Sequence, residues 1–161
     1  MNDRAWELLR EGTDLLRQGK VREALPLLEE AHEIDKVQPD VALNLGSAYI
    51  LAGKFSKAVP ILEALRAREP ANAMVWTNLG AAYLGNPVLA TDEQQRAAID
   101  AFKRALEIDP VAPSVAYNIG LIYRDRGERE KAIQWFGRAL ESNPRDQHAR
   151  HVLRRLIDEE E

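Results

Sequence analysis

The stretch Trp76-Thr77-Asn78-Leu79-Gly80-Ala81-Ala82-Tyr83 decides the fold, because similar stretches recur before and after it. The equivalent glycines, Gly12, Gly46, Gly80 and Gly120, are spaced 34, 34 and 40 residues apart. Downstream of them, Ala24, Ala58, Ala98 and Ala132 are spaced 34, 40 and 34 residues apart. A period of this length indicates one supersecondary unit copied along the chain, each copy burying its apolar face against its neighbours.

Each copy contains two segments whose apolar residues recur at i, i+3, i+4 and i+7, the spacing of one helix face. The recurring Gly and Ala are expected where two antiparallel helices approach most closely, because larger side chains would wedge them apart. Glycines are expected to close first helices and prolines to stop second helices, at Gly19, Gly53, Gly127, Pro70, Pro110 and Pro144. We therefore expect helices over roughly 3–18, 21–34, 39–52, 55–68, 73–84, 92–107, 113–126, 129–142 and 146–158.

The third copy resembles the tetratricopeptide repeat (TPR) pattern in Trp76-x-x-Leu79-Gly80-x-x-Tyr83, Ala98-x-x-x-Phe102 and Pro110. The second and fourth copies keep most of this pattern, and the first is the least faithful. The resemblance implies an all-α fold, a right-handed α-solenoid of four TPR helix-turn-helix repeats plus a C-terminal capping helix. We expect a single TPR domain over residues 1–161. Its repeats would span about 5–38, 39–72, 73–112 and 113–146, with the capping helix at about 146–158.

The third copy carries an insertion, because its glycine and the next are 40 residues apart where the other copies keep 34, a difference of six. The period places this insertion near residues 85–90, between the two helices of the copy. Thr91 and Gln94 match a capping box, so part of the insertion is expected to extend the second helix backwards. The rest is a loop whose Val88 and Leu89 either fold back on the solenoid or contact a partner. We expect that the solenoid does not require this loop.

Composition narrows the classes of partner. The chain has 22 Lys and Arg against 26 Asp and Glu, a formal net charge of −4, which argues against a nucleic-acid or anionic-membrane surface. The chain has no cysteine, which excludes disulfides, thiolate catalysis and Cys-based zinc sites. The sequence has neither a membrane-length apolar run nor an opening apolar core of the signal-peptide type. We predict no membrane insertion and a cytoplasmic location.

Catalytic and metal-binding motifs are missing from the sequence. The histidines are His32, His148 and His151, and none has a Ser or Asp motif around it. His148 and His151 are expected at the surface. His148 and His151 lie at i and i+3, but two imidazoles without a third ligand make a poor metal site. Every glycine is assigned to helix packing or capping, which leaves no phosphate-binding loop. We therefore expect no enzyme, no cofactor and no metal.

In TPR proteins the first helices of successive repeats line a concave groove, so the resemblance implies a peptide-binding groove here. Its expected residues are Leu9, Thr13, Leu43, Asn44, Ser47, Thr77, Asn78, Ala81, Tyr117, Asn118, Leu121 and Arg124, extended on the terminal helix by His151 and Arg155. The same family positions also include Trp6, Arg10, Leu16, Asp40, Ile50, Met74, Leu84 and Ser114, and His148 belongs to the terminal extension.

Asn44, Asn78 and Asn118 share one position in their repeats. An amide both donates and accepts hydrogen bonds, so three in a row can hold a peptide backbone of any sequence. The alternative is that Asn is simply common at this family position. Because these residues lie away from the glycine positions, we expect them to contribute affinity without supporting the fold.

The leading hypothesis is a non-enzymatic adaptor or scaffold that binds a partner peptide or helix in its concave groove. The alternative is a self-assembling scaffold whose groove is filled by a terminal helix of another copy. A basic end formed by Arg124, His148, His151 and Arg155 would favour an acidic group on the ligand. The competing interpretation is a solvated basic face offset by the acidic residues of the chain terminus.

Overall fold

The structure is a computed structural model that describes residues 2–159. These residues form nine helices and no strand. The helices are α1 (Asp3–Arg17), α2 (Val21–Ile34), α3 (Pro39–Leu51), α4 (Phe55–Arg68), α5 (Ala73–Leu84), α6 (Asp92–Ile108), α7 (Val115–Asp125), α8 (Arg129–Ser142) and α9 (Gln147–Asp158). The expected all-α architecture is confirmed, and all the expected helix bounds agree within two residues. No helix within residues 2–159 is long and apolar enough to cross a membrane.

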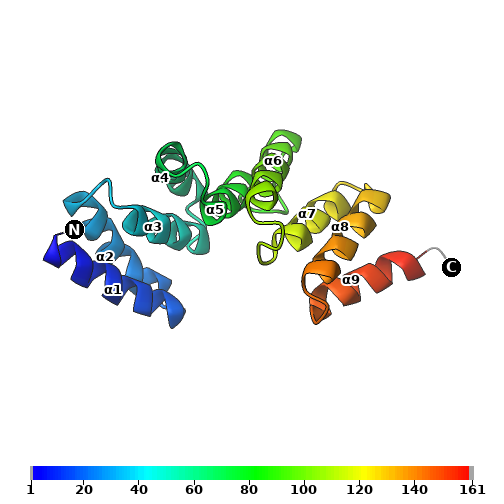
Figure 1. Cartoon of the computed structure of the whole chain (residues 1–161), viewed down its shortest axis with the longest axis horizontal. Coiled ribbons are helices and arrows are strands. Elements are labelled where there is room, and N and C mark those ends of the chain that lie inside the picture. The colour runs from blue at the N-terminus through cyan, green and yellow to red at the C-terminus, as the bar shows by residue number, and fades with distance from the viewer. Residues whose placement is uncertain (1, 160–161) are drawn as a thin grey trace.

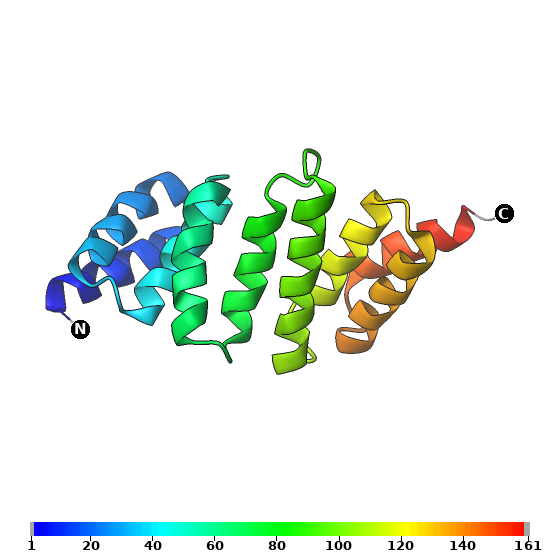
Figure 2. The same ribbon diagram turned by 90° about the horizontal axis from the view of Figure 1, so that it is seen from above.

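The helices form an elongated array with the two chain ends at opposite ends (Figure 1). Helices α1 and α2, α3 and α4, α5 and α6, and α7 and α8 pair as the two helices of each repeat, and α9 packs on α8. Seen from above, α4, α6 and α8 lie in front, whereas α3, α7 and α9 lie behind them (Figure 2). The first helices of the repeats thus share one side of the array, which we call the first-helix face.

Each pair closes around a glycine that has no room for a side chain. A Cβ atom on Gly80 would lie 2.5 Å from two ring carbons of Phe102 in α6, closer than real Cβ contacts. The same atom on Gly46 would lie 2.6 Å from Leu62, and on Gly120 2.8 Å from Phe136. The sequence prediction that these glycines mark the closest approach of two helices is confirmed.

Two other groups of glycines behave differently. Gly19, Gly53 and Gly127 end their first helices with φ of 75°, 72° and 75°, a left-handed conformation that glycine adopts without strain. Gly137 contradicts the assignment of every glycine to packing or capping. It lies inside α8, and no atom stands within 4 Å of where its Cβ would be.

Apolar side chains fill two clusters that meet inside the third repeat. The first lies mainly in α1 to α5 and the second in α6 to α9. The half-buried rings of Trp76 and Tyr83 in α5 pack against both clusters. The Tyr83 hydroxyl also donates to Glu63 Oε1 of α4 at 2.8 Å. Burial raises the pKa of Tyr83, as do its hydrogen bond and its proximity to this carboxylate. The α5 helix therefore joins the two halves of the core.

The insertion extends α6 and leaves a short exposed loop. Thr91 and Gln94 form the predicted capping box, so α6 begins at Asp92 and has 17 residues, against 14 in α4. Val88 is 90% exposed and Leu89 75% exposed. The alternative in which these two side chains fold back on the solenoid is therefore wrong.

Helix α7 begins at Val115, two residues later than predicted, because its capping residue is missing. Eight residues before their glycines, Gln38 and Asn72 accept hydrogen bonds from backbone N–H groups at the starts of α3 and α5. The equivalent residue in the fourth repeat is Ala112, which has no side-chain acceptor. The cap moves to Ser114, whose φ of 64° is left-handed and whose side chain makes no capping bond. Such a conformation is strained for a residue other than glycine.

Gly80→Ala is expected to lower the free energy of unfolding by about 1–3 kcal/mol, because the new methyl group overlaps the Phe102 ring. Gly137→Ala is the matched control, and we expect it to raise the free energy of unfolding by up to about 1 kcal/mol. Urea titration followed by circular dichroism measures both. Equal effects of the two substitutions would contradict the requirement for glycine where the two helices of a repeat approach most closely.

Ala112→Asn is expected to restore the missing cap, start α7 earlier and raise the free energy of unfolding by about 1 kcal/mol. Ala112→Val, which adds volume but no acceptor, serves as the control and gives no such gain. Thermal melting measures the stability, and amide exchange at residues 113–116 reports where α7 begins. Because Ala112 is only 7% exposed, exchange at residues 113–116 decides the outcome. An asparagine variant whose α7 still begins at Val115 would show that the late start has another cause.

Candidate peptide-binding groove

The amino-terminal end of the first-helix face is hollowed into an open pocket of about 720 Å³. Helices α1 and α3 form it, and its lining residues are Asp3, Trp6, Glu7, Leu9, Arg10, Thr13, Asp14, Arg17, Asp40 and Asn44. The structure thus brings together Leu9, Thr13 and Asn44, three of the residues expected in the groove. Apolar, aromatic and charged side chains of both signs meet here, a mixture suited to contacting a peptide.

Leu9 and Trp6 have opposite roles in this pocket. Leu9 lines the pocket but is only 3% exposed and belongs to the core, so it offers little surface to a ligand. Trp6 is 55% exposed, although its indole is among the largest apolar side chains. The family positions include Trp6, but the shorter set of expected groove residues leaves it out. Only the packing of α1 on α3 reveals it as an exposed aromatic wall.

Polar side chains in the middle of the face are bonded within the protein. Asn78 Nδ2 of α5 donates to Ser47 Oγ of α3 at 2.8 Å, so this pair links the second and third repeats. Asn44 Nδ2 donates to the backbone oxygen of Asp40 at 2.8 Å. Ser47 and Thr77 also donate to backbone oxygens one turn earlier in their own helices. We expected the three asparagines to make no contribution to the fold. For Asn78 this expectation is wrong, because its side chain links two repeats.

The fourth repeat stands apart from this row. Contacts join α1 with α3 and α3 with α5, whereas α5 and α7 have no comparable contact among the described helices. Tyr117 of α7 instead packs its ring against Phe136 of its own repeat, with ring centres 5.6 Å apart. Asn118 makes no side-chain hydrogen bond within residues 2–159 and lies beyond this gap. Leu43, Ala81 and Leu121 are half-buried, so they contribute partial surface.

The predicted basic end is built from exposed side chains on two helices. Arg124 of α7 pairs with the neighbouring Asp125, with 3.0 Å between Nη2 and Oδ1, so part of its charge is offset locally. His151 and Arg155 are exposed on α9, which packs on α8. A preference of this end for acidic ligands stays a prediction.

No group of three or more His, Cys, Asp or Glu residues with metal-site geometry occurs in the part of the chain that the structure describes. His32 is half-buried on α2. Its Nδ1 is buried without a hydrogen-bond partner within residues 2–159. Burial lowers the pKa of His32, so its neutral form is favoured.

Two models described as tetratricopeptide repeat match this chain, at residues 15–83 and 87–147. The chain therefore belongs to the TPR family, and its fold is an α-solenoid of TPR repeats. Proteins of this class are protein-interaction scaffolds, and this chain is one of them.

Among individual proteins, the photosystem I assembly protein Ycf3 of Sorghum bicolor is 55% identical over 40 residues. That segment is 24% of this chain and spans 23% of the length of Ycf3, about a quarter of that curated relative.

Solved structures share the fold over most of the chain. A structure of MamA from Desulfovibrio magneticus RS-1 matches with a TM-score of 0.76 and 22% identity, covering 89% of this chain and 77% of its own. A thermophilic TPR protein of Thermus thermophilus matches with a TM-score of 0.69 and 21% identity, covering 95% of this chain and 98% of its own.

Asn78→Ala is expected to lower the free energy of unfolding by about 1 kcal/mol, because it removes the bond that joins α3 to α5. A double-mutant cycle with Ser47→Ala isolates the energy of that bond. Asn118→Ala is the matched control, with an expected change within about 0.5 kcal/mol. Urea unfolding of all variants provides the measurement, and zero coupling between Ser47 and Asn78 would refute the link.

Proposed function

We propose that this chain is a non-enzymatic adaptor that binds a peptide or helix of a partner protein on its first-helix face. The observation that carries the proposal is the pocket between α1 and α3, with Trp6 exposed on its wall above the buried Leu9. An exposed indole in a concave site supports binding, because a ligand can cover apolar area that water otherwise faces.

The polar residues of the pocket would orient the ligand. The Asn44 side-chain oxygen accepts no hydrogen bond within residues 2–159, so it is available to a ligand N–H group. Asp40 and Arg10 face the same pocket with opposite charges and suit a peptide that carries both signs. Ser47, Thr77, Asn78 and Ala81 would continue the contact surface along α3 and α5.

Residues of the fourth repeat and α9 form a second, separate part of the proposed site. Tyr117, Asn118, Leu121 and Arg124 would be reached only by a ligand long enough to pass the gap between α5 and α7. His151 and Arg155 extend the surface further. No cofactor, metal or nucleic acid has a role in this proposal, and the cytoplasmic location stays a prediction.

Self-assembly is the second candidate, and opposite charges at the two ends of the array favour it. The exposed face of α9 carries Arg150, Arg154 and Arg155, whereas the pocket at the other end is acidic on balance. Its four carboxylates outnumber its two arginines, and these residues are Asp3, Glu7, Asp14, Asp40, Arg10 and Arg17. A terminal helix of one copy could therefore dock in the pocket of the next.

Trp6→Ala tests the proposal with a peptide selected from a random display library on the full-length chain. We expect at least a tenfold loss of affinity, because truncating an aromatic anchor in a pocket commonly costs about 2 kcal/mol or more. Val88→Ala is the matched control, since Val88 is exposed on the loop and does not line the pocket. Isothermal titration calorimetry measures the affinities.

Equal affinity of the selected peptide for the wild type and the Trp6 variant would contradict the proposal. Light scattering of the chain alone, over the same concentrations, shows whether another copy is the occupant. A mass that grows with concentration and falls on Trp6→Ala would favour self-assembly over the adaptor.

A further inference from the structure

The junction between the third and fourth repeats is built differently from the junction between the second and third. At the earlier junction, α3 contacts α5 and Ser47 bonds to Asn78 across the two first helices. At the later junction, α5 and α7 have no comparable contact among the described helices, although α6 still packs on α7. The first helices are therefore in less extensive direct contact at this junction, and contacts on another side of the array contribute to the link.

The insertion places polar side chains close to this junction. Gln95 of α6 precedes Ala98 by three residues, just as Phe55, the first residue of α4, precedes the equivalent Ala58. Asp92 therefore lies in an additional turn of α6 that precedes the regular helix start. The capping box of Thr91 and Gln94 holds this turn, with Gln94 N donating to Thr91 Oγ1 at 3.2 Å and Thr91 N donating to Gln94 Oε1 at 2.9 Å.

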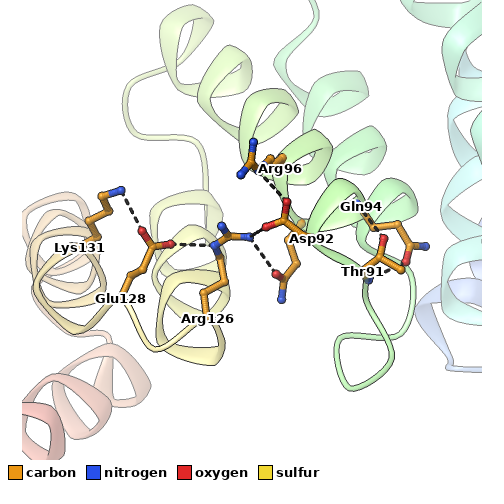
Figure 3. Close-up of polar contacts among 8 residues, drawn as sticks. Thr91, Asp92, Gln94, Arg96, Arg126, Glu128 and Lys131 are labelled. Atoms are coloured by element: carbon orange, nitrogen blue, oxygen red, sulfur yellow. Dashed lines mark hydrogen bonds and ion pairs between the residues drawn. The ribbon is translucent and has the colours of Figure 1, made fainter.

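Arg126, in the turn between α7 and α8, reaches across the junction to this additional turn (Figure 3). Its Nη1 lies 2.6 Å from Asp92 Oδ1 and 3.1 Å from Gln95 Oε1. Its Nε donates to Glu128 Oε2 at 2.7 Å, which holds the guanidinium from the other side. The Arg126 side chain is only 19% exposed, so these bonds are partly shielded from water.

Two further ion pairs hold the carboxylates in place. Arg96 Nε lies 2.9 Å from Asp92 Oδ2, and Lys131 Nζ lies 3.0 Å from Glu128 Oε1 (Figure 3). Hydrogen bonds from Arg126 and Lys131 hold the pKa of Glu128 below its usual range. Hydrogen bonds to Glu128 and Asp92 raise the pKa of Arg126. Both shifts favour the charged forms of Glu128 and Arg126.

Equivalent residues in the earlier repeats cannot form this contact. Arg126 directly precedes Gly127, and the residues that precede Gly19 and Gly53 are Gln18 and Ala52. Neither is cationic, and the second helices that begin at Val21 and Phe55 have no additional turn with a capping box. The charged residue and the insertion occur together, on the two sides of one junction.

We propose that the insertion and Arg126 form an ionic clasp that sets the angle between the third and fourth repeats. The clasp thereby fixes how far apart α5 and α7 lie on the first-helix face. If the proposed function holds, the clasp determines whether one ligand can contact both parts of the groove. The additional turn of α6 that the insertion provides is then a device for the geometry of the groove.

The test uses the full chain without any ligand and measures distances between pairs of spin labels. The sequence has no cysteine, so Ser56→Cys and Ser142→Cys label α4 and α8 at exposed sites without further changes. Double electron–electron resonance then reports the distance from the second repeat to the fourth, which spans the clasped junction. A second pair, Arg22→Cys with Ser56→Cys, spans only the first two repeats and serves as the internal control.

Arg126→Gln is expected to shift and broaden the 56–142 distance distribution and to leave the 22–56 distribution unchanged. Asp92→Asn should act in the same direction but less, because Arg126 retains Gln95 and Glu128. Arg17→Gln, which breaks an exposed pair with Asp14 inside α1, is the matched control and should change neither distribution. If Arg126→Gln fails to fold, Asp92→Asn carries the test.

An unchanged 56–142 distribution in a folded Arg126 variant would overturn the clasp, as would equal broadening of both label pairs. Because no ligand is present, this outcome is independent of whether the groove binds peptides. Failure of the Trp6 experiment would reject the proposed function and leave the clasp standing. If both hold, Arg126→Gln should weaken peptides that span α5 and α7, and leave peptides confined to the α1–α3 pocket unaffected.

Discussion

The structure depends on the close approach of two helices at a residue that has no side chain. At Gly80 the Phe102 ring occupies the space that a Cβ atom would need, and Gly12, Gly46 and Gly120 repeat this arrangement. Because dispersion and apolar burial reward such contact, each helix pair forms a thin, closely packed unit. Units of nearly constant thickness stack in one direction, so the first helices of the repeats share a side.

Holding the stack together uses part of the polar surface on that side. The Asn78 amide and the Ser47 hydroxyl satisfy each other between α3 and α5, and Asn44 donates to its own helix. A buried or half-buried polar group is costly unless it is paired, so these bonds stabilise the stack and also reduce what a ligand can reach. The surface that remains most available is the pocket beside Trp6, whose side chain is 55% exposed.

The two sides of the third repeat illustrate two ways of joining neighbours. The rings of Trp76 and Tyr83 in α5 pack against both core clusters, and toward the second repeat α5 adds the hydrogen bond from Tyr83 to Glu63. Toward the fourth repeat, part of the connection passes to charged groups at the edge, around Arg126. Salt screens ion pairs between half-exposed groups and weakens them, whereas it does not weaken apolar contacts in this way. The two junctions therefore differ in what can loosen them.

The sequence by itself determined the helices, their pairing and the family. Helix positions follow from local preferences and from a repeated pattern, and four copies of that pattern reinforce one another. Even the additional turn of α6 follows locally, because Thr91 and Gln94 lie three residues apart. The late start of α7 has a local cause too, the missing acceptor at Ala112, but the prediction followed the period and not the cap.

Only the tertiary structure decided which side chains are exposed and which polar groups are already bonded. Leu9 and Trp6 both belong to the family positions for the groove, yet one is in the core and the other is an open wall. The partners of Asn78 and Arg126 lie 31 and 34 residues earlier in the chain, at Ser47 and Asp92. Such contacts depend on the angle between repeats. That angle results from many small packing contacts, so a local sequence pattern does not predict it.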